Sequence, residues 1–315
     1  MKKFLCLMSV LILGISLFTT GCTQEISEDN GKINIVAVNF PQYDFSREIA
    51  KDKANIKMLI QPGGETHTYE PAPSDIISIE TSDVFLYIGG ESDEWVESIL
   101  ETLDTGNTQV IRLMDFVDTL EEEKTEGMQS DTDYDEDDEP EKDEHIWTSP
   151  KNAVKMVNAI SEALCKADKE NEKFYKENTK SYIEKLNGLD EKFRDIVKTA
   201  RRKELVFGDR FPLIYFTKEY GLKCYAAFPG CSDETEPSAS TIAFLIDKVN
   251  SDHIPVVMKI ELSNGSVAET VASATDTSVE TFYSCHNLSK EQFDSGESYI
   301  SMMEHNTEVL KKSLN

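Results

Sequence analysis

Residues 83–90 read Asp83-Val84-Phe85-Leu86-Tyr87-Ile88-Gly89-Gly90, a short apolar run that ends at two glycines. Such a run is typical of a strand buried on both faces, as in parallel sheets covered by helices. A similar run occurs at Ile33-Asn34-Ile35-Val36-Ala37-Val38, and residues 55–60 and 110–113 have comparable patterns. Stretches with helical spacing separate these runs. The alternation predicts an α/β lobe with a mostly parallel sheet.

Residues 150–202 have a different, strongly helical pattern. Apolar residues recur at helical spacing over residues 153–164 and 182–197, and Gly188 is the only glycine in the stretch. Strand–helix alternation resumes at residue 204. We therefore expect two α/β lobes, each with a mostly parallel sheet flanked by helices, joined by a long linking helix.

The first residues have the features of an export signal. Lys2 and Lys3 precede an apolar run, residues 4–18, that is too short to span a membrane comfortably. Cys22 follows a small residue, as in the bacterial lipoprotein cleavage box, although Thr19 replaces the usual Leu. The resemblance implies a lipid on Cys22 and a mature chain tethered outside the cell membrane. An ordinary secreted protein is the alternative.

The composition limits both the fold and the partners. Of the 315 residues, 39% are hydrophobic, which is enough for a core and excludes wholesale disorder. The net charge of −27 argues against nucleic-acid binding and favours cations. Residues 121–144 contain fourteen acidic residues against two lysines, so we expect a mobile loop there. This acidic segment either gathers divalent cations weakly or is a plain linker.

Together these features predict five parts of the chain. They are a lipoprotein signal ending at the lipidated Cys22, a tether, a first α/β lobe that includes the acidic segment, a helical region with the linking helix, and a second α/β lobe. Their predicted bounds are 1–22, 23–32, 33–149, 150–203 and 204–315.

Four stretches of the sequence are recognisable together. Residues 62–75 read Pro-Gly-x-x-x-His-x-Tyr-Glu-Pro-x-Pro-Ser-Asp, and residues 143–150 read Asp-x-His-x-Trp-x-x-Pro. Residues 215–222 read Tyr-Phe-x-x-x-Tyr-Gly-Leu, and residues 299–306 read Tyr-x-x-x-Met-x-x-Asn. In this order the chain resembles the metal-binding solute receptors of bacterial zinc and manganese ABC importers. The resemblance implies two lobes around an ion and a linking helix that limits their movement.

The resemblance also implies a set of ligands. Its two first-lobe imidazoles fall on His67 and His145. The second lobe usually supplies a His or Glu before the Tyr-Gly-Leu segment and an Asp before the last helix. Here the former place reads Gly208-Asp209-Arg210, where only Asp209 can bind a cation, and His286 replaces the usual Asp. The implied metal ligands are therefore His67, His145, His286 and Asp209.

Three imidazoles with a carboxylate or water suit Zn²⁺ in tetrahedral geometry, with Mn²⁺ as the alternative. Each imidazole needs a partner for its second nitrogen, and Glu65, Glu70 and Glu144 are the nearby candidates. His253 and His305 lack a motif, so we expect them at the surface. We expect Trp147 to pack beside the site.

The cysteines fit an oxidising compartment. Cys165, Cys224, Cys231 and Cys285 remain after the signal and the lipidated Cys22, and they allow three full pairings. The resemblance favours a disulfide between Cys231 and Cys285. Two free thiols are the alternative.

These interpretations lead to a functional hypothesis. We expect a monomeric, lipid-anchored, extracytoplasmic receptor that captures zinc and delivers it to the membrane permease of an ABC importer. A manganese or iron receptor of the same family is the alternative. A zinc enzyme is less consistent, because the sequence has no His-Glu-x-x-His helix, Gly-x-Ser-x-Gly elbow or phosphate-binding glycine loop. A surface adhesin is a third class, for which no residue identifies a ligand.

Overall fold

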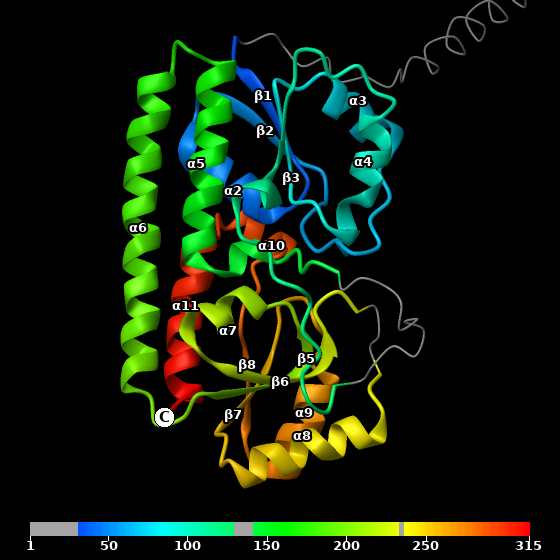
Figure 1. Ribbon diagram of the computed structural model, residues 1–315, viewed down its shortest axis with the longest axis vertical. Coiled ribbons are helices and arrows are strands. Elements are labelled where there is room, and N and C mark those ends of the chain that lie inside the picture. The colour runs from blue at the N-terminus through cyan, green and yellow to red at the C-terminus, as the bar shows by residue number, and fades with distance from the viewer. Residues whose placement is uncertain (1–30, 129–140, 233–235) are drawn as a thin grey trace, which may run out of the picture. The chain divides into compact units, whose positions relative to one another are not determined.

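The computed structural model describes residues 31–128, 141–232 and 236–315 (Figure 1). The predicted signal peptide, the lipidated Cys22 and nearly all of the tether lie outside the described residues, as does the middle of the acidic segment. Within the described part of the chain, no helix is long and apolar enough to cross a membrane.

The first lobe contains a four-stranded parallel sheet in the order β2-β1-β3-β4. Its strands are β1 (Ile33–Ala37), β2 (Ala54–Met58), β3 (Val84–Tyr87) and β4 (Gln109–Arg112). Its helices are α2 (Phe40–Ala50), α3 (Pro73–Glu80), α4 (Glu94–Leu100) and α5 (Pro150–Ala167), with short 3₁₀ turns η1 (Glu91–Asp93), η2 (Leu113–Phe116) and η3 (Ile146–Thr148).

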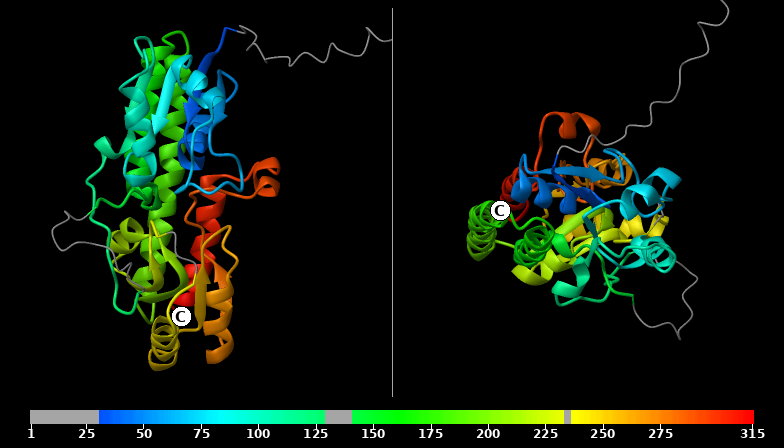
Figure 2. Two further views of the ribbon diagram at one scale, coloured as in Figure 1. Left: turned by 90° about the vertical axis from the view of Figure 1, so that its right-hand side faces the viewer. Right: turned by 90° about the horizontal axis from the view of Figure 1, so that it is seen from above.

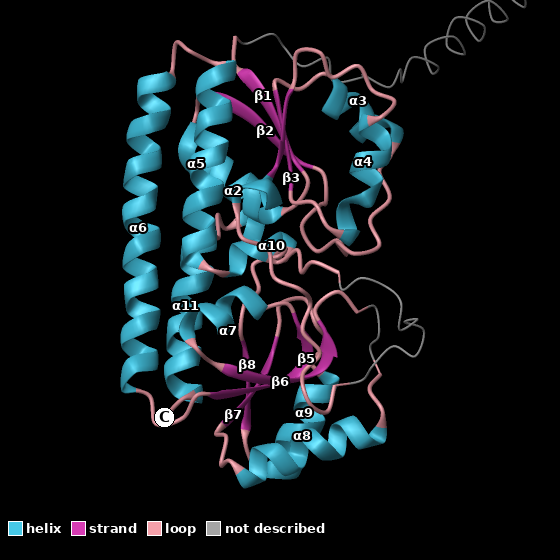
Figure 3. Cartoon of the chain, viewed as in Figure 1, coloured by secondary structure: helices cyan, strands magenta, loops and turns pink. Residues whose placement is uncertain are grey.

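Alternate residues of β1 pack on opposite faces of this sheet, as the two-residue period of a strand requires. Ile35 packs with residues of α2 and α5 in the main core. Val36 packs on the other face with Ile79 of α3 and Val96 of α4. Helices therefore cover both faces, as Figure 3 shows, and this explains why the strands read as continuous apolar runs.

The second lobe repeats this topology, with a parallel sheet in the order β6-β5-β7-β8. Its strands are β5 (Glu204–Phe211), β6 (Lys223–Pro229), β7 (Val256–Lys259) and β8 (Ser278–Thr281). Its helices are α7 (Ile214–Tyr220), α8 (Ala239–Ser251), α9 (Ser266–Thr275), α10 (Lys290–Asp294) and α11 (Tyr299–Ser313). The strand–helix alternation predicted from residue 204 onward is therefore confirmed.

The predicted helical region consists of two helices. Helix α5 ends at Ala167, and α6 (Glu172–Thr199) runs back beside it (Figures 1 and 2). The 28 residues of α6 span about 42 Å, enough to pass both lobes. Asn178 of α6 bonds the Ile49 carbonyl in the first lobe, and Phe193 contacts Phe216 in the second at 4.9 Å between ring centroids. Helix α6 is the linking helix.

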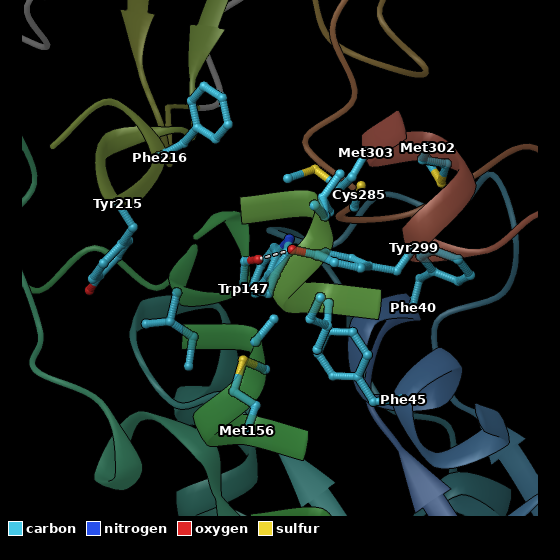
Figure 4. Close-up of a cluster of buried hydrophobic side chains, with 14 of the residues drawn as sticks. Phe40, Phe45, Trp147, Met156, Tyr215, Phe216, Cys285, Tyr299, Met302 and Met303 are labelled. Atoms are coloured by element: carbon cyan, nitrogen blue, oxygen red, sulfur yellow. Dashed lines mark hydrogen bonds between the residues drawn. The ribbon is translucent and has the colours of Figure 1, made fainter. Parts of the chain in front are cut away.

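Buried side chains also join the lobes behind the site (Figure 4). Tyr299 of α11 is fully buried, and its hydroxyl donates to the Trp147 carbonyl at 2.7 Å. Its backbone N–H donates to Asp44 Oδ2 at 2.9 Å. Trp147 in turn donates from Nε1 to the Ser284 carbonyl at 2.8 Å. This connected core fixes the two lobes where their loops meet.

The described ends of the acidic segment are built into the fold, which corrects the expectation of a mobile loop over the whole of residues 121–144. Glu121 and Lys142 pair as an isolated antiparallel bridge, so the described ends of the segment lie side by side. Asp143 and Glu144 are 1% and 3% exposed. They are ordered because their carboxylates accept hydrogen bonds from a backbone N–H and a serine. The predicted mobility concerns mainly residues outside the described part.

Candidate metal centre

Three predicted ligands, His67, His145 and His286, lie together between the lobes. His67 is in the loop after β2, His145 immediately precedes η3, and His286 is in the loop after β8. Their ring centroids are 5.1–5.7 Å apart. All three line one cavity. The sequence stretches that carry these residues are 78 or more positions apart, yet the fold places their imidazoles within reach of a single ion.

Each of the three rings has a neighbour at Nδ1. Ser92 Oγ lies 2.9 Å from Nδ1 of His67, and Thr66 Oγ1 lies 3.3 Å from Nδ1 of His286. The Asp143 carboxylate is 3.3 Å from Nδ1 of His145. Partners at Nδ1 leave Nε2 as the nitrogen for a metal, the usual arrangement for ligating histidines.

Ser92 fixes the tautomer of His67. Its hydroxyl proton is donated to Glu144 Oε1 at 2.5 Å, so its oxygen accepts from the Nδ1–H of His67. The ring therefore carries its proton on Nδ1 and presents a lone pair at Nε2.

Glu144 belongs to the same cluster, because donor atoms of His67, Glu144, His145 and His286 lie within 4.8 Å of one another. Both of its oxygens already accept from Ser92, one from the hydroxyl and one from the backbone N–H at 3.0 Å. One oxygen also lies 3.5 Å from Nδ1 of His67, on the side of the ring away from Nε2. These contacts favour Glu144 as the group that orients His67 rather than as a direct ligand.

His145 gives the clearest indication that the site fits a metal ion. Its side chain is fully buried, and neither ring nitrogen makes a hydrogen bond within the described part of the chain. A buried polar group without a partner is costly, and a metal ion at Nε2 would satisfy it. The donor set thus fits a soft-to-borderline cation that accepts imidazole.

The three histidines differ in acidity. Burial, together with the charges of His145 and Arg210, lowers the pKa of His67 to about 3. Burial and the neighbouring His67 and His145 also hold the pKa of His286 well below its usual value. Burial opposes protonation of His145 too, but the carboxylates of Asp143 and Glu144 outweigh it and raise its pKa. Two of the rings are therefore neutral and ready for a metal at neutral pH.

The loop that carries His286 is held by Glu261. This buried carboxylate accepts from the Ser284 N–H at 2.6 Å, the Ser284 hydroxyl at 2.7 Å and the His286 N–H at 2.9 Å. From the other lobe, the Gly63 N–H donates to the Leu288 carbonyl at 2.8 Å. These bonds position the second-lobe imidazole against the first lobe, and sequence reasoning did not identify Glu261.

Asp209, the fourth predicted ligand, lies outside the cluster of donor atoms, although it lines the same cavity. Its oxygens accept from the backbone N–H groups of Arg210 at 2.9 Å and Ile260 at 3.3 Å. The register of β5 shifts between Phe207 and Arg210, which accounts for this orientation. At Gly208 an added Cβ would lie 2.4 Å from Ala268 Cα, so a side chain does not fit there.

The predicted disulfide between Cys231 and Cys285 is wrong: both are free, as are Cys165 and Cys224. Cys285 is buried in the main hydrophobic core, near Met303 in Figure 4. Cys231 is partly exposed, and its N–H donates to Glu122 of the acidic segment. The two cysteines follow different strands of the second sheet, β6 and β8, which lie at its opposite edges.

The minor expectations are borne out. His253 and His305 are exposed. Trp147 is buried, with its ring 4.9 Å from that of His286. The orienting residues Ser92, Thr66 and Glu261 carry no motif signal, so only the tertiary structure could identify them.

Two parallel-sheet lobes with a buried ligand site between them define the class of two-lobed solute-binding proteins. Residues 35–313 match the family model described as zinc-uptake complex component A, periplasmic, and the chain belongs to this family of extracytoplasmic binding proteins.

Two relatives and one solved structure illustrate the match. The chain is 33% identical over 290 residues to the high-affinity zinc uptake system protein ZnuA of Bacillus subtilis, covering 90% of this chain and 88% of that protein. It is 32% identical to the zinc-binding lipoprotein AdcA of Streptococcus pneumoniae, covering 99% of this chain but only 61% of AdcA. The Zn(II)-bound ZnuA-like domain of AdcA superposes with a TM-score of 0.74 at 30% identity, over 90% of this chain and 99% of that domain.

Proposed function

We propose that this protein captures Zn²⁺ outside the cell membrane with His67, His145 and His286 and delivers it to the permease of an ABC importer. The observation that carries the proposal is the convergence of three imidazoles, of which that of His145 is fully buried, each with a neighbour at Nδ1 and with Nε2 left for a metal. The zinc names of the relatives support the same cargo.

The chemistry of the site favours zinc over manganese. Zinc accepts tetrahedral sets of imidazoles with one open position, whereas manganese prefers oxygen-rich, octahedral sets. The three nitrogen donors and the engagement of Glu144 with Ser92 therefore support zinc. A manganese or iron receptor remains the second candidate, because imidazole accepts those metals as well.

The proposal extends to the location and assembly of the protein. We infer a lipid anchor on Cys22, which would hold the receptor at the outer face of the membrane, close to its importer. The AdcA relative is named a lipoprotein, which supports this inference. We infer that the receptor acts as a monomer. The family consists of binding proteins, so no catalytic role is assigned.

The test is a metal titration of the chelator-stripped protein against a chromophoric competitor. We expect nanomolar or tighter binding of Zn²⁺ and much weaker binding of Mn²⁺, at one site per chain. Equal affinity for the two ions would overturn the assignment of zinc. Absence of tight binding for either ion would overturn the receptor function itself.

A further inference from the structure

The cavity beside the three imidazoles is larger than a metal ion needs. It has a volume of about 280 Å³ and extends from His67, His145 and His286 to β5 and the loop after β7. This volume is close to the lower end of the range for small-molecule sites, about 300–1,000 Å³. The space can therefore hold a molecule of several heavy atoms next to the ion.

Arg210 places a positive charge on the wall of this cavity. Its side chain is only 19% exposed, and its charge contributes to the lowered pKa values of His67 and His286. A guanidinium close to a bound dication is repelled by it. An anion between the two would turn this repulsion into two attractions.

The counter-charge that Arg210 now has is weak. Within the described residues its guanidinium forms an ion pair with Glu65, at 3.5 Å, and the Glu65 side chain is 50% exposed. Exposed pairs of this kind contribute little, so a ligand carboxylate can displace Glu65. A guanidinium has five N–H donors in a planar fork that matches a carboxylate.

The other carboxylates on the cavity wall form no ion pair with Arg210 within the described residues, although the charge of Arg210 does act on the neighbouring Asp209. The side chain of Asp209 accepts from two backbone N–H groups, and that of Glu261 holds the His286 loop. The fully buried His145, whose Nε2 makes no hydrogen bond with the described residues, lines the same space. The cavity wall therefore combines three imidazoles that can bind a metal with the Arg210 guanidinium, whose N–H groups can bind an anion.

We propose that a small carboxylate anion occupies this cavity together with the metal, with one oxygen on the ion and the other on Arg210. The cargo is then a metal–carboxylate complex, and the anion takes the coordination position that the protein leaves open. This inference rests on the proposed function, because it requires a metal at the three imidazoles.

The test uses the protein loaded with Co²⁺, whose visible spectrum reports the ligands of the ion. Succinate and acetate are titrated into the loaded protein in a non-coordinating buffer, with inorganic phosphate as a separate arm. We expect a saturable spectral change with the carboxylates. Arg210→Gln should weaken their binding at least tenfold, whereas Glu65→Gln should tighten it by removing the competing carboxylate. Arg201→Gln, at an exposed arginine outside the cavity, is the matched control.

The outcomes separate this inference from the function on which it rests. Tight Co²⁺ binding without a spectral response to succinate would overturn the carboxylate site but leave the receptor function intact. An equal response in Arg210→Gln and wild type would overturn the role of Arg210. A response to phosphate alone would overturn the assignment of a carboxylate. Failure to bind Co²⁺ or Zn²⁺ at all would instead contradict the proposed function.

Discussion

The two lobes have the same strand order but make unequal contributions to the site. The order β2-β1-β3-β4 in the first corresponds to β6-β5-β7-β8 in the second. Among the described residues, the first lobe contributes His67, Glu144 and His145 to the cluster of donor atoms, whereas the second contributes His286 alone. Where a second-lobe ligand would be expected, the chain has a register shift in β5, a glycine packed against α9, and Arg210. Equal topology therefore does not imply an equal share in binding, because the loops rather than the strands carry the ligands.

The largest expected effect tests whether the first lobe alone can bind Zn²⁺ tightly. His67→Ala and His286→Ala should each weaken Zn²⁺ binding by more than about 100-fold, because loss of a direct ligand exceeds the 10–100-fold typical of its supporting partners. Competition titration measures both, with His253→Ala as the exposed control. If His286→Ala binds like wild type, the site belongs to the first lobe alone.

The next effect compares two carboxylates, one from each lobe. Glu144→Gln should weaken Zn²⁺ binding about 10–100-fold, because it disturbs the Ser92 hydrogen bonds that orient His67. Asp209→Asn should change the affinity little, since its oxygens bond backbone N–H groups. The same competition titration applies to both variants. The reverse ranking would restore Asp209 as a ligand.

A smaller effect concerns how the second lobe positions its single imidazole. Glu261→Gln turns an acceptor oxygen into an amide that faces N–H donors, which should lower the free energy of unfolding by about 1–3 kcal/mol. It should also weaken Zn²⁺ binding about tenfold through the displaced His286. Denaturant unfolding measures the free energy of unfolding, and competition titration measures the Zn²⁺ affinity. Unchanged metal affinity at reduced stability would assign Glu261 a purely structural role.

A separate effect, on stability and not on metal affinity, is a pH dependence that arises in the first lobe. Burial, with the charge of Glu144, raises the pKa of Asp93 from 3.8 to about 7 in the folded protein. The native state thus binds the proton more tightly than the unfolded chain, so this contribution to stability is present at low pH and is lost as pH rises through about 7.

Asp93→Asn should remove that loss, because an amide oxygen can still accept from the Ile88 and Gly89 N–H groups. The metal-free variant should be more stable than wild type by up to about 4 kcal/mol at pH 8 and nearly equal at pH 4. Denaturant unfolding at the two pH values measures the difference. A constant difference between wild type and variant across pH would contradict a shifted Asp93.

The α/β lobes, the linking region and the three histidines could be predicted from the sequence. Buried parallel strands must be apolar on both faces, so runs such as residues 83–88 reveal the α/β lobes directly. Helical spacing over residues 150–202 predicted the linking region, although the break near Asp168 was missed. His67 and His145 lie in long motifs whose residues also build the local loops, and His286 could be inferred by resemblance.

The remaining features depend on contacts between residues far apart in the chain. Ser92 orients His67 through Glu144, 52 residues further along, and Glu261 reaches His286 across 25 residues. Asp209 lies outside the cluster of donor atoms beside a register shift in β5, and Cys231 and Cys285 follow strands at opposite edges of one sheet. The sequence by itself determined the lobes, the helix that joins them and the imidazoles. Only the tertiary structure decided which carboxylates support them and which cation shares their cavity, because hydrogen bonds and charges act through space, and local pattern does not record those distances.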